Sequence, residues 1–325
     1  MNPNLNTGLG NLMASAVFTQ AMQNNPTTGR VVFVGASSLA LVNEVQQMYG
    51  TTYPDGMRTV FTTLALAIAS CVASRGDLII VLPGHTETIS SSTALAFNIA
   101  GITIVGIGNG ALKPTFTLDT AATARIAVSV ANVTVRNIKF VANFADIATV
   151  FLLTTAQGFT VDSCEFLDTS SVLNFLAIVT TTVAVVADNL TFTNNKIIGL
   201  GTTAGTTPIK IVGTHNRLTI NDNYINLAIL NNTSAVLAHA ALVVTNLQMY
   251  RNRVFRPNTD TATGGILITT SSTTNTGIVA DNYIFASDTA AAILVTAGSI
   301  YGMFNNLYIG DADASGFVLP AIGAN

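Results

Sequence analysis

Hydrophobic and polar positions follow a short pattern that recurs along most of the chain. The pattern is apolar, Thr, apolar, two polar residues, Asn, any residue, apolar, and Leu218-Thr-Ile-Asn-Asp-Asn-Tyr-Ile225 is a clear copy. Alternation with a period of two is typical of a strand that has one buried face. We therefore expect residues such as Leu218 and Ile220 to enter a core and the intervening Thr to lie on the outer surface.

Eight copies of this pattern follow one another at a nearly regular spacing. Their sixth positions are Ile107, Ile138, Cys164, Asn195, Asn223, Asn252, Asn282 and Asn306. Successive copies lie 24 to 31 residues apart, and a period of about 28 residues with short β-rich segments is typical of a solenoid. The sequence thus predicts an all-β solenoid in which each repeat forms one coil and strands of successive coils pair in parallel.

Asparagine occupies the sixth position in the later copies. We expect the chain to bend there, because Asn tolerates the left-handed conformation and hydrogen-bonds its own backbone. Stacked coils would place these side chains above one another, where they can form a hydrogen-bonded ladder. The predicted ladder consists of Asn195, Asn223, Asn252, Asn282 and Asn306, and Ile138 and Cys164 replace it with apolar packing in earlier coils.

The segment before the repeats has helical rather than strand periodicity. Apolar residues lie at helical spacing from Phe61 to Val72, which predicts an amphipathic capping helix over residues 59–74. Terminal repeats of solenoids need a cap, so we expect this helix to close the open end of the core. Residues 51–325, including the helix, are interpreted as a single β-helix domain.

Residues 1–50 lie outside the repeats and form a small N-terminal appendage. A strand is predicted over Arg30–Gly35 and a short helix over Leu39–Tyr49, with Ser37 or Ser38 as the N-cap and Gly50 at its end. We interpret residues 1–50 as an arm for assembly contacts.

The order of these features resembles a known superfamily. Asp55-Gly56, the helix, Gly76-Asp-Leu-Ile-Ile-Val-Leu-Pro-Gly84 and the Asn-marked coils resemble pectate-lyase-like proteins over residues 53–309. The resemblance implies a right-handed, single-stranded parallel β-helix with an N-terminal capping helix. Pro83-Gly-His-Thr-Glu87 and Ile104-Val-Gly-Ile-Gly-Asn-Gly110 look like virion structural proteins of tailed bacteriophages. That similarity implies a homotrimer located in the virion, with other virion proteins such as the major capsid protein as partners.

Charged residues are scarce for a chain of this length. Only 9% of the 325 residues are Asp, Glu, Lys or Arg, against roughly 25% in ordinary soluble domains. The net charge of -3 provides no basic field for nucleic acid or an anionic membrane surface. The longest apolar stretches are shorter than the ~20 residues of a membrane-spanning helix, so we expect no membrane span. The surface is expected to consist mainly of uncharged polar residues or to be covered by other subunits.

Candidate catalytic groups occupy the fifth positions of three successive copies. Asp222, Arg251 and Asp281 follow one another there, and two coil steps would separate the carboxylates by ~9.6 Å, near the upper limit for an inverting glycosidase. The alternative is that Arg251 bridges both acids in a solvated charge ladder. Tyr224, Tyr250, Tyr283 and Tyr308 are candidates for outward rings that stack on sugars.

No cofactor or metal ion is expected. Cys71 and Cys164 form no Cys-x-x-Cys motif, and His85, His215 and His239 lack the spacing of metal ligands. Together with the resemblance, these observations favour a non-enzymatic virion structural protein that decorates or cements the capsid. The alternative is a tail spike or fibre that binds or depolymerises a host surface polysaccharide.

Overall fold

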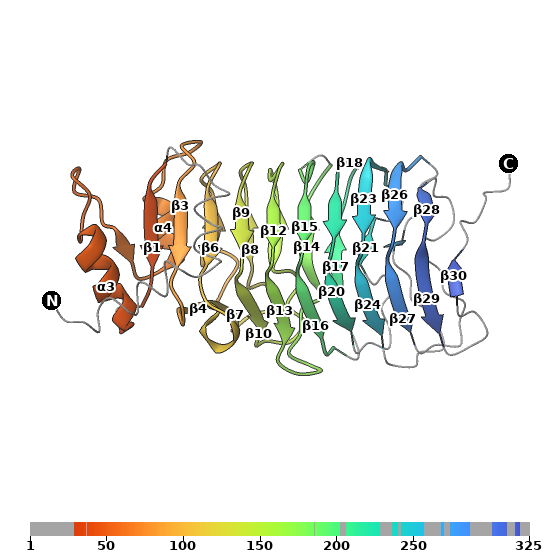
Figure 1. Ribbon diagram of the computed structural model, residues 1–325, viewed down its shortest axis with the longest axis horizontal. Coiled ribbons are helices and arrows are strands. Elements are labelled where there is room, and N and C mark those ends of the chain that lie inside the picture. The colour runs from red at the N-terminus through yellow and green to blue at the C-terminus, as the bar shows by residue number, and fades with distance from the viewer. Residues whose placement is uncertain are drawn as a thin grey trace.

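The chain forms a parallel β-solenoid whose coils stack along the long axis of the molecule (Figure 1). The computed structural model describes residues 29–36, 38–184, 186–201, 206–227, 236–239, 242–256, 268–269, 274–286, 301–310 and 316–318. Within these residues, no helix is both long and apolar enough to cross a bilayer.

Three long sheets form the walls of the solenoid. The first has eleven strands in the order β2 (Val60–Phe61), β1 (Val31–Val34), β3 (Leu78–Val81), β6 (Thr103–Gly106), β9 (Thr134–Arg136), β12 (Thr160–Asp162), β15 (Thr191–Thr193), β19 (Thr219–Asn221), β23 (Leu247–Tyr250), β26 (Gly277–Ala280) and β28 (Gly302–Phe304). The second has ten strands, β4 (Thr86–Ile89), β7 (Thr115–Leu118), β10 (Lys139–Ala142), β13 (Glu165–Asp168), β16 (Lys196–Gly199), β20 (Tyr224–Leu227), β24 (Arg253–Arg256), β27 (Tyr283–Ala286), β29 (Asn306–Gly310) and β30 (Gly316–Val318).

The third sheet has seven strands: β5 (Leu95–Phe97), β8 (Ile126–Val128), β11 (Phe151–Leu153), β14 (Ala177–Thr181), β17 (Thr207–Lys210), β21 (Leu237–Ala238) and β25 (Ile268–Thr269). A short pair, β18 (His215–Asn216) and β22 (Val244–Thr245), lies beside them. Neighbouring strands pair in parallel, except that β30 pairs antiparallel with β29. The prediction of a parallel β-solenoid is therefore confirmed.

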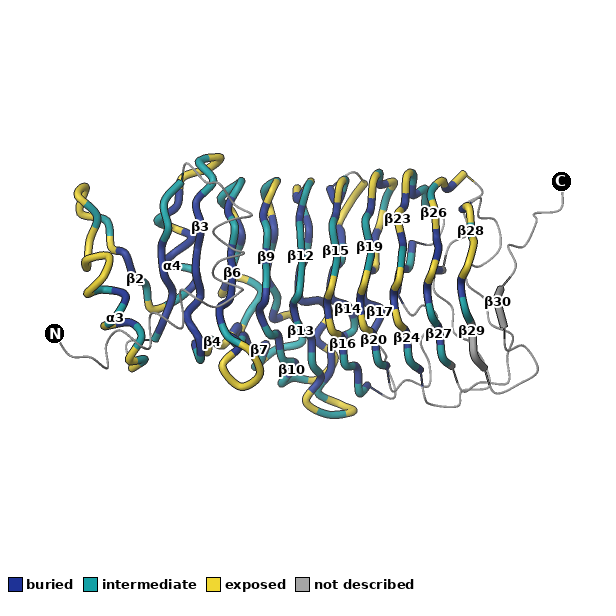
Figure 2. The backbone as a smooth tube through the Cα atoms, viewed as in Figure 1, coloured by how far each residue is buried: buried dark blue, intermediate teal, exposed yellow. Residues whose placement is uncertain are grey.

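Each repeat spans the corner between the first two sheets. In the copy at Leu218–Ile225, Thr219–Asn221 form β19 and the last residues begin β20. Leu218 and Ile220 are fully buried, whereas Thr219 is half-buried on the outer face. The alternation therefore divides core from surface as predicted (Figure 2).

The left-handed bend lies one position earlier than expected. The fifth residue of the repeat, and not the sixth, has a positive φ in each later copy: Asn137, Ser163, Asn194, Asp222, Arg251, Asp281 and Asn305. Most side chains at this bend lie at the outer surface, although that of Asn137 is buried, and the side chain of the sixth residue turns into the interior. This correction explains why the sixth position is buried and why Asp and Asn are frequent at the fifth, since both tolerate a positive φ.

The predicted asparagine ladder is present inside this corner. The side-chain oxygen of Asn252 accepts hydrogen bonds from the backbone N–H and the Nδ2 of Asn223, at 3.1 and 2.8 Å. The Nδ2 of Asn252 donates to the carbonyl of Ile220 and to Oδ1 of Asn282. The same pattern continues from Asn195 to Asn306. Each coil is thereby tied to the next by buried polar contacts.

Phenylalanine rings fill the core of the middle coils. Phe140 and Phe166 are paired in register on adjacent strands, and their rings stack with centroids 5.3 Å apart. Phe151 of the third sheet meets Phe140 and Phe159 edge-on, each at 5.2 Å. These rings are fully buried and join the sheets across the interior.

The N-terminal end of the core is closed by a helix that is shorter than predicted. Helix α4 covers Leu64–Ala69 rather than 59–74, because Val60 and Phe61 form strand β2 and pair with β1. Leu64, Ala67 and Ile68 are buried in the same core as the coils. The capping position is therefore as expected, although the helix has fewer turns.

The segment assigned to the N-terminal appendage contributes to the solenoid. Strand β1, predicted over Arg30–Gly35, lies between β2 and β3, so the first sheet begins before residue 51. Helix α3 (Ala40–Tyr49) packs on the outer face of this end through Val42 and Val45. Gly50 ends the helix with a positive φ, but Leu39 is the N-cap and no side chain caps the helix. The assembly role of residues 1–50 stays a prediction, and residues 1–28 lie outside the described residues.

A short 3-10 helix, η1 (Gly110–Leu112), completes the described elements.

Candidate functional site

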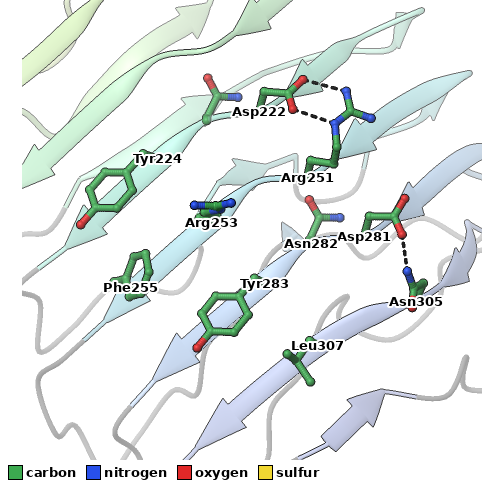
Figure 3. A pocket seen from close by; sticks show the side chains of 11 residues that line it. Asp222, Tyr224, Arg251, Arg253, Phe255, Asp281, Asn282, Tyr283, Asn305 and Leu307 are labelled. Atoms are coloured by element: carbon green, nitrogen blue, oxygen red, sulfur yellow. Dashed lines mark hydrogen bonds and ion pairs between the residues drawn. The ribbon is translucent and has the colours of Figure 1, made fainter.

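An open groove of about 910 Å³ lies on the outer surface at the corner between the first two sheets. It is formed by two parallel columns of side chains from successive coils (Figure 3). The fifth positions of the repeats supply Asp222, Arg251, Asp281 and Asn305, and the seventh positions supply Tyr224, Arg253, Tyr283 and Leu307. The groove follows the axis of the solenoid, because each column takes one residue from each successive coil. The ladder residues Asn223 and Asn282 lie between the two columns.

The three candidate acid and base residues lie together in this groove. Arg251 donates from Nε and a terminal nitrogen to the two carboxylate oxygens of Asp222, at 2.7 and 2.8 Å. Hydrogen bonding to Asp222, with the nearby negative charges, raises the pKa of Arg251. Asp281 instead accepts a hydrogen bond from the amide of Asn305. Asp222 is therefore held in a bidentate ion pair, and the two acids have different partners.

Aromatic rings form the other side of the groove. The ring of Phe255 lies between those of Tyr224 and Tyr283, with centroids 5.3 and 5.8 Å away. Tyr224 begins β20 and Tyr283 begins β27, and both side chains reach the outer surface. Tyrosine rings combine an apolar face with a hydroxyl group, which suits contacts with the faces and hydroxyls of a sugar.

Arg253 lies between the two tyrosines. It is the register partner of Tyr224 on one side and of Tyr283 on the other, and its side chain is exposed. Figure 3 shows its guanidinium in the middle of the groove. The groove thus contains two carboxylates, from Asp222 and Asp281, and two guanidinium groups, from Arg251 and Arg253.

Part of this groove was predicted from the sequence. Asp222, Arg251, Asp281, Tyr224 and Tyr283 are all brought together. Tyr250 lies on β23 of the first sheet and does not line the groove, and the side chain of Tyr308 falls outside the described part of the chain.

Arg253, Phe255, Asn305 and Leu307 were missed by the sequence analysis. Arg253 has the seventh position of the repeat, the same position as the two tyrosines. This shared position is the feature of the sequence from which the place of Arg253 in the groove could have been predicted.

Asp222 is not free to act as a general acid or base while it is paired with Arg251. A general acid or base must be within reach of the proton that it transfers, and both oxygens of Asp222 are engaged by Arg251. No cluster of three potential metal ligands occurs among the residues that the structure describes.

Comparison of the chain with protein-family models and with curated proteins found no match.

A buried histidine in the same coils makes their stability sensitive to acid. Nδ1 of His239 lies 3.2 Å from the carbonyl oxygen of Leu242, and Nε2 lies 3.2 Å from the hydroxyl of Tyr301. Burial, with a smaller effect of the nearby His215, lowers the pKa of His239 to about 4 from its ordinary value of 6.5. The folded state therefore holds this ring neutral at a pH where the unfolded chain would protonate it.

We expect His239 to lower stability as the pH falls from about 6.5 to about 4, by about 3 kcal/mol in total. The measurement is the urea-unfolding free energy of the protein and of His239→Gln at several pH values across this range. The difference between the two proteins should change with pH in the stated direction, because other titrating groups are common to both. Parallel pH curves would contradict the prediction.

Proposed function

We propose that the chain is a non-enzymatic structural component of a tailed-bacteriophage virion, in which it decorates the capsid. The observation that supports this proposal is the charge-poor solenoid, which offers long side surfaces suited to repeated contacts. The resemblance of the sequence to virion proteins supports the location. In this proposal the partners are further copies of the chain, as a homotrimer, and the major capsid protein.

The test of location is quantitative mass spectrometry of purified particles from the source. Decoration predicts a copy number near that of the major capsid protein, or a simple fraction of it. A few copies per particle would instead support a tail spike or fibre. Absence of the chain from particles would refute both locations.

The proposed trimer and its attachment are tested separately. Light scattering should yield a mass of three chains of 33.8 kDa, and the mass of one chain would refute the trimer. For attachment, residues 1–28 should be deleted rather than 1–50, because β1 and α3 belong to the folded end of the solenoid. Loss of capsid binding by a folded deletion variant is expected if the arm makes the contact.

A second candidate function is the binding of a host surface glycan in the groove. The observation that favours it is the combination of tyrosine rings with charged side chains along one open channel. This function predicts saturable binding of oligosaccharides without turnover, measured by calorimetry. Tyr283→Ala should weaken binding of neutral and charged sugars alike, because the ring face is common to both.

Depolymerisation of the glycan is the enzymatic alternative. It would require Asp222 and Asp281 as an acid and base pair, so Asp222→Asn and Asp281→Asn should each abolish release of reducing ends if the groove is catalytic. Because Arg251 pairs with both carboxylate oxygens of Asp222, we expect the unaltered protein to release no reducing ends from a panel of host polysaccharides. Release that both substitutions abolish would establish the enzymatic alternative.

A further inference from the structure

We propose that the groove selects acidic saccharides and that Arg253 is the residue that recognises their carboxylate. This inference rests on the glycan-binding function proposed above for the same groove. It adds the chemical class of the ligand and names a residue that determines specificity.

The charged side chains in the groove are not all paired with one another. Asp222 and Arg251 neutralise each other through two hydrogen bonds, and Asp281 accepts from the neutral amide of Asn305. Within the part of the chain that the structure describes, the backbone N–H of Arg253 donates to the carbonyl of Asn223 at 2.8 Å, but its side chain makes no ion pair or hydrogen bond. Its guanidinium is thus the cation in the groove that is available to a ligand.

Aromatic rings lie on both sides of Arg253 in the groove. Tyr224 and Tyr283 flank the guanidinium along the groove (Figure 3), because they are the register partners of Arg253 on the two neighbouring strands. Phe255 contacts both of these rings. Apolar neighbours reduce the competition from water and strengthen a charged hydrogen bond. The planar guanidinium can donate two parallel hydrogen bonds to a carboxylate, while a sugar ring contacts the neighbouring tyrosines.

The groove is suited to a ligand with few negative charges. Asp281 lies in the column opposite Arg253, and because its hydrogen-bond partner Asn305 is neutral, its charge would repel a ligand with several negative charges. A polyphosphate or nucleic acid also requires several cations for binding. A saccharide that presents one carboxylate to the groove fits better, because its hydroxyl groups can donate to Asp281 while that single charge meets Arg253.

The experiment compares two ligands that differ only in charge. The first is a hexasaccharide that contains glucuronic acid, and the second is the same hexasaccharide with each carboxyl group reduced to an alcohol. Calorimetry at low and physiological salt measures binding of both to the full chain. We expect the acidic ligand to bind at least tenfold more tightly, with the preference reduced by salt.

Substitutions at Arg253 show whether this residue causes the preference. Arg253→Gln should remove the preference, at a loss of about tenfold or more for the acidic ligand and little change for the reduced one. Arg253→Lys should retain part of it, because the charge remains but the paired donors are lost. Arg217→Gln is the matched control, since Arg217 is also exposed but lies outside the groove.

The outcomes separate this inference from the function on which it rests. Equal binding of both ligands, or a preference that survives Arg253→Gln, would overturn the role of Arg253 and leave glycan binding intact. Binding of the reduced ligand alone would do the same. If neither hexasaccharide binds and a panel of neutral and acidic glycans also fails, glycan binding is refuted together with this inference.

Discussion

Replacing Asn252 with aspartate is expected to lower the free energy of unfolding by about 4 kcal/mol at pH 7. The amide of Asn252 donates to the Ile220 carbonyl and to Oδ1 of Asn282, at 2.8 and 2.9 Å. An aspartate has nearly the same shape but cannot donate when ionised. It would remove a hydrogen bond from each of these two buried acceptors and place a negative charge beside them, although Oδ1 of Asn282 would keep the hydrogen bond from the backbone N–H of Asn252. Urea unfolding measures the change.

The loss should be smaller at acid pH, where a protonated aspartic acid can donate one hydrogen bond. Asn109→Asp serves as the control, because Asn109 is exposed and its side chain makes no capping hydrogen bond. We expect that substitution to change stability by less than about 0.5 kcal/mol. Equal stability of the two variants would show that the ladder contributes little.

Phe151→Ala is expected to destabilise the protein by about 4 kcal/mol, because it removes a fully buried ring and leaves a cavity. The ring meets Phe140, Phe159 and Phe166 edge-on, with centroids 5.2 to 6.3 Å away. Coils on both sides cannot collapse freely into the space, since their strands are held in register by parallel pairing. The midpoint and slope of urea unfolding measure the loss.

Two further variants separate cavity formation from the loss of an aromatic residue. Phe151→Leu keeps most of the volume and should cost clearly less than Phe151→Ala. Phe304→Ala removes a ring that is 52% exposed, and we expect a change within about 0.5 kcal/mol. A similar cost for Phe304→Ala and Phe151→Ala would contradict the importance of the core cluster.

Much of the fold was predictable because its information is local and repeated. The alternation around Leu218 and Ile220 marks which residues are buried, and the recurrence of that pattern stacks identical faces on one another. The ladder was predictable for the same reason: asparagines at one position of each coil must meet when coils stack in parallel. The capping position of α4 also followed from its apolar spacing.

The predictions from the sequence were wrong where the local hydrophobic pattern and the pairing of strands favour different structures. Phe61 fits a helix by its spacing and Val60 lies within the predicted range 59–74, yet both form β2, because the backbone of β1 offers them hydrogen-bonding partners. The left-handed residue was placed at the conspicuous Asn, whereas the structure has it at the preceding residue. An Asn is compatible with either position, so its identity alone could not decide between a bend and a buried ladder.

The sequence by itself determined the solenoid, the spacing of its coils and the sixth-position ladder, since these depend on periodic burial and on stacking of equivalent residues. Only the tertiary structure decided that the fifth and seventh positions face each other across one groove. It also decided that Arg251 pairs with Asp222 while Arg253 stays available between Tyr224 and Tyr283. The physical reason is that side chains about 30 residues apart become neighbours through the inter-coil register, and the bend geometry then sets which of them meet.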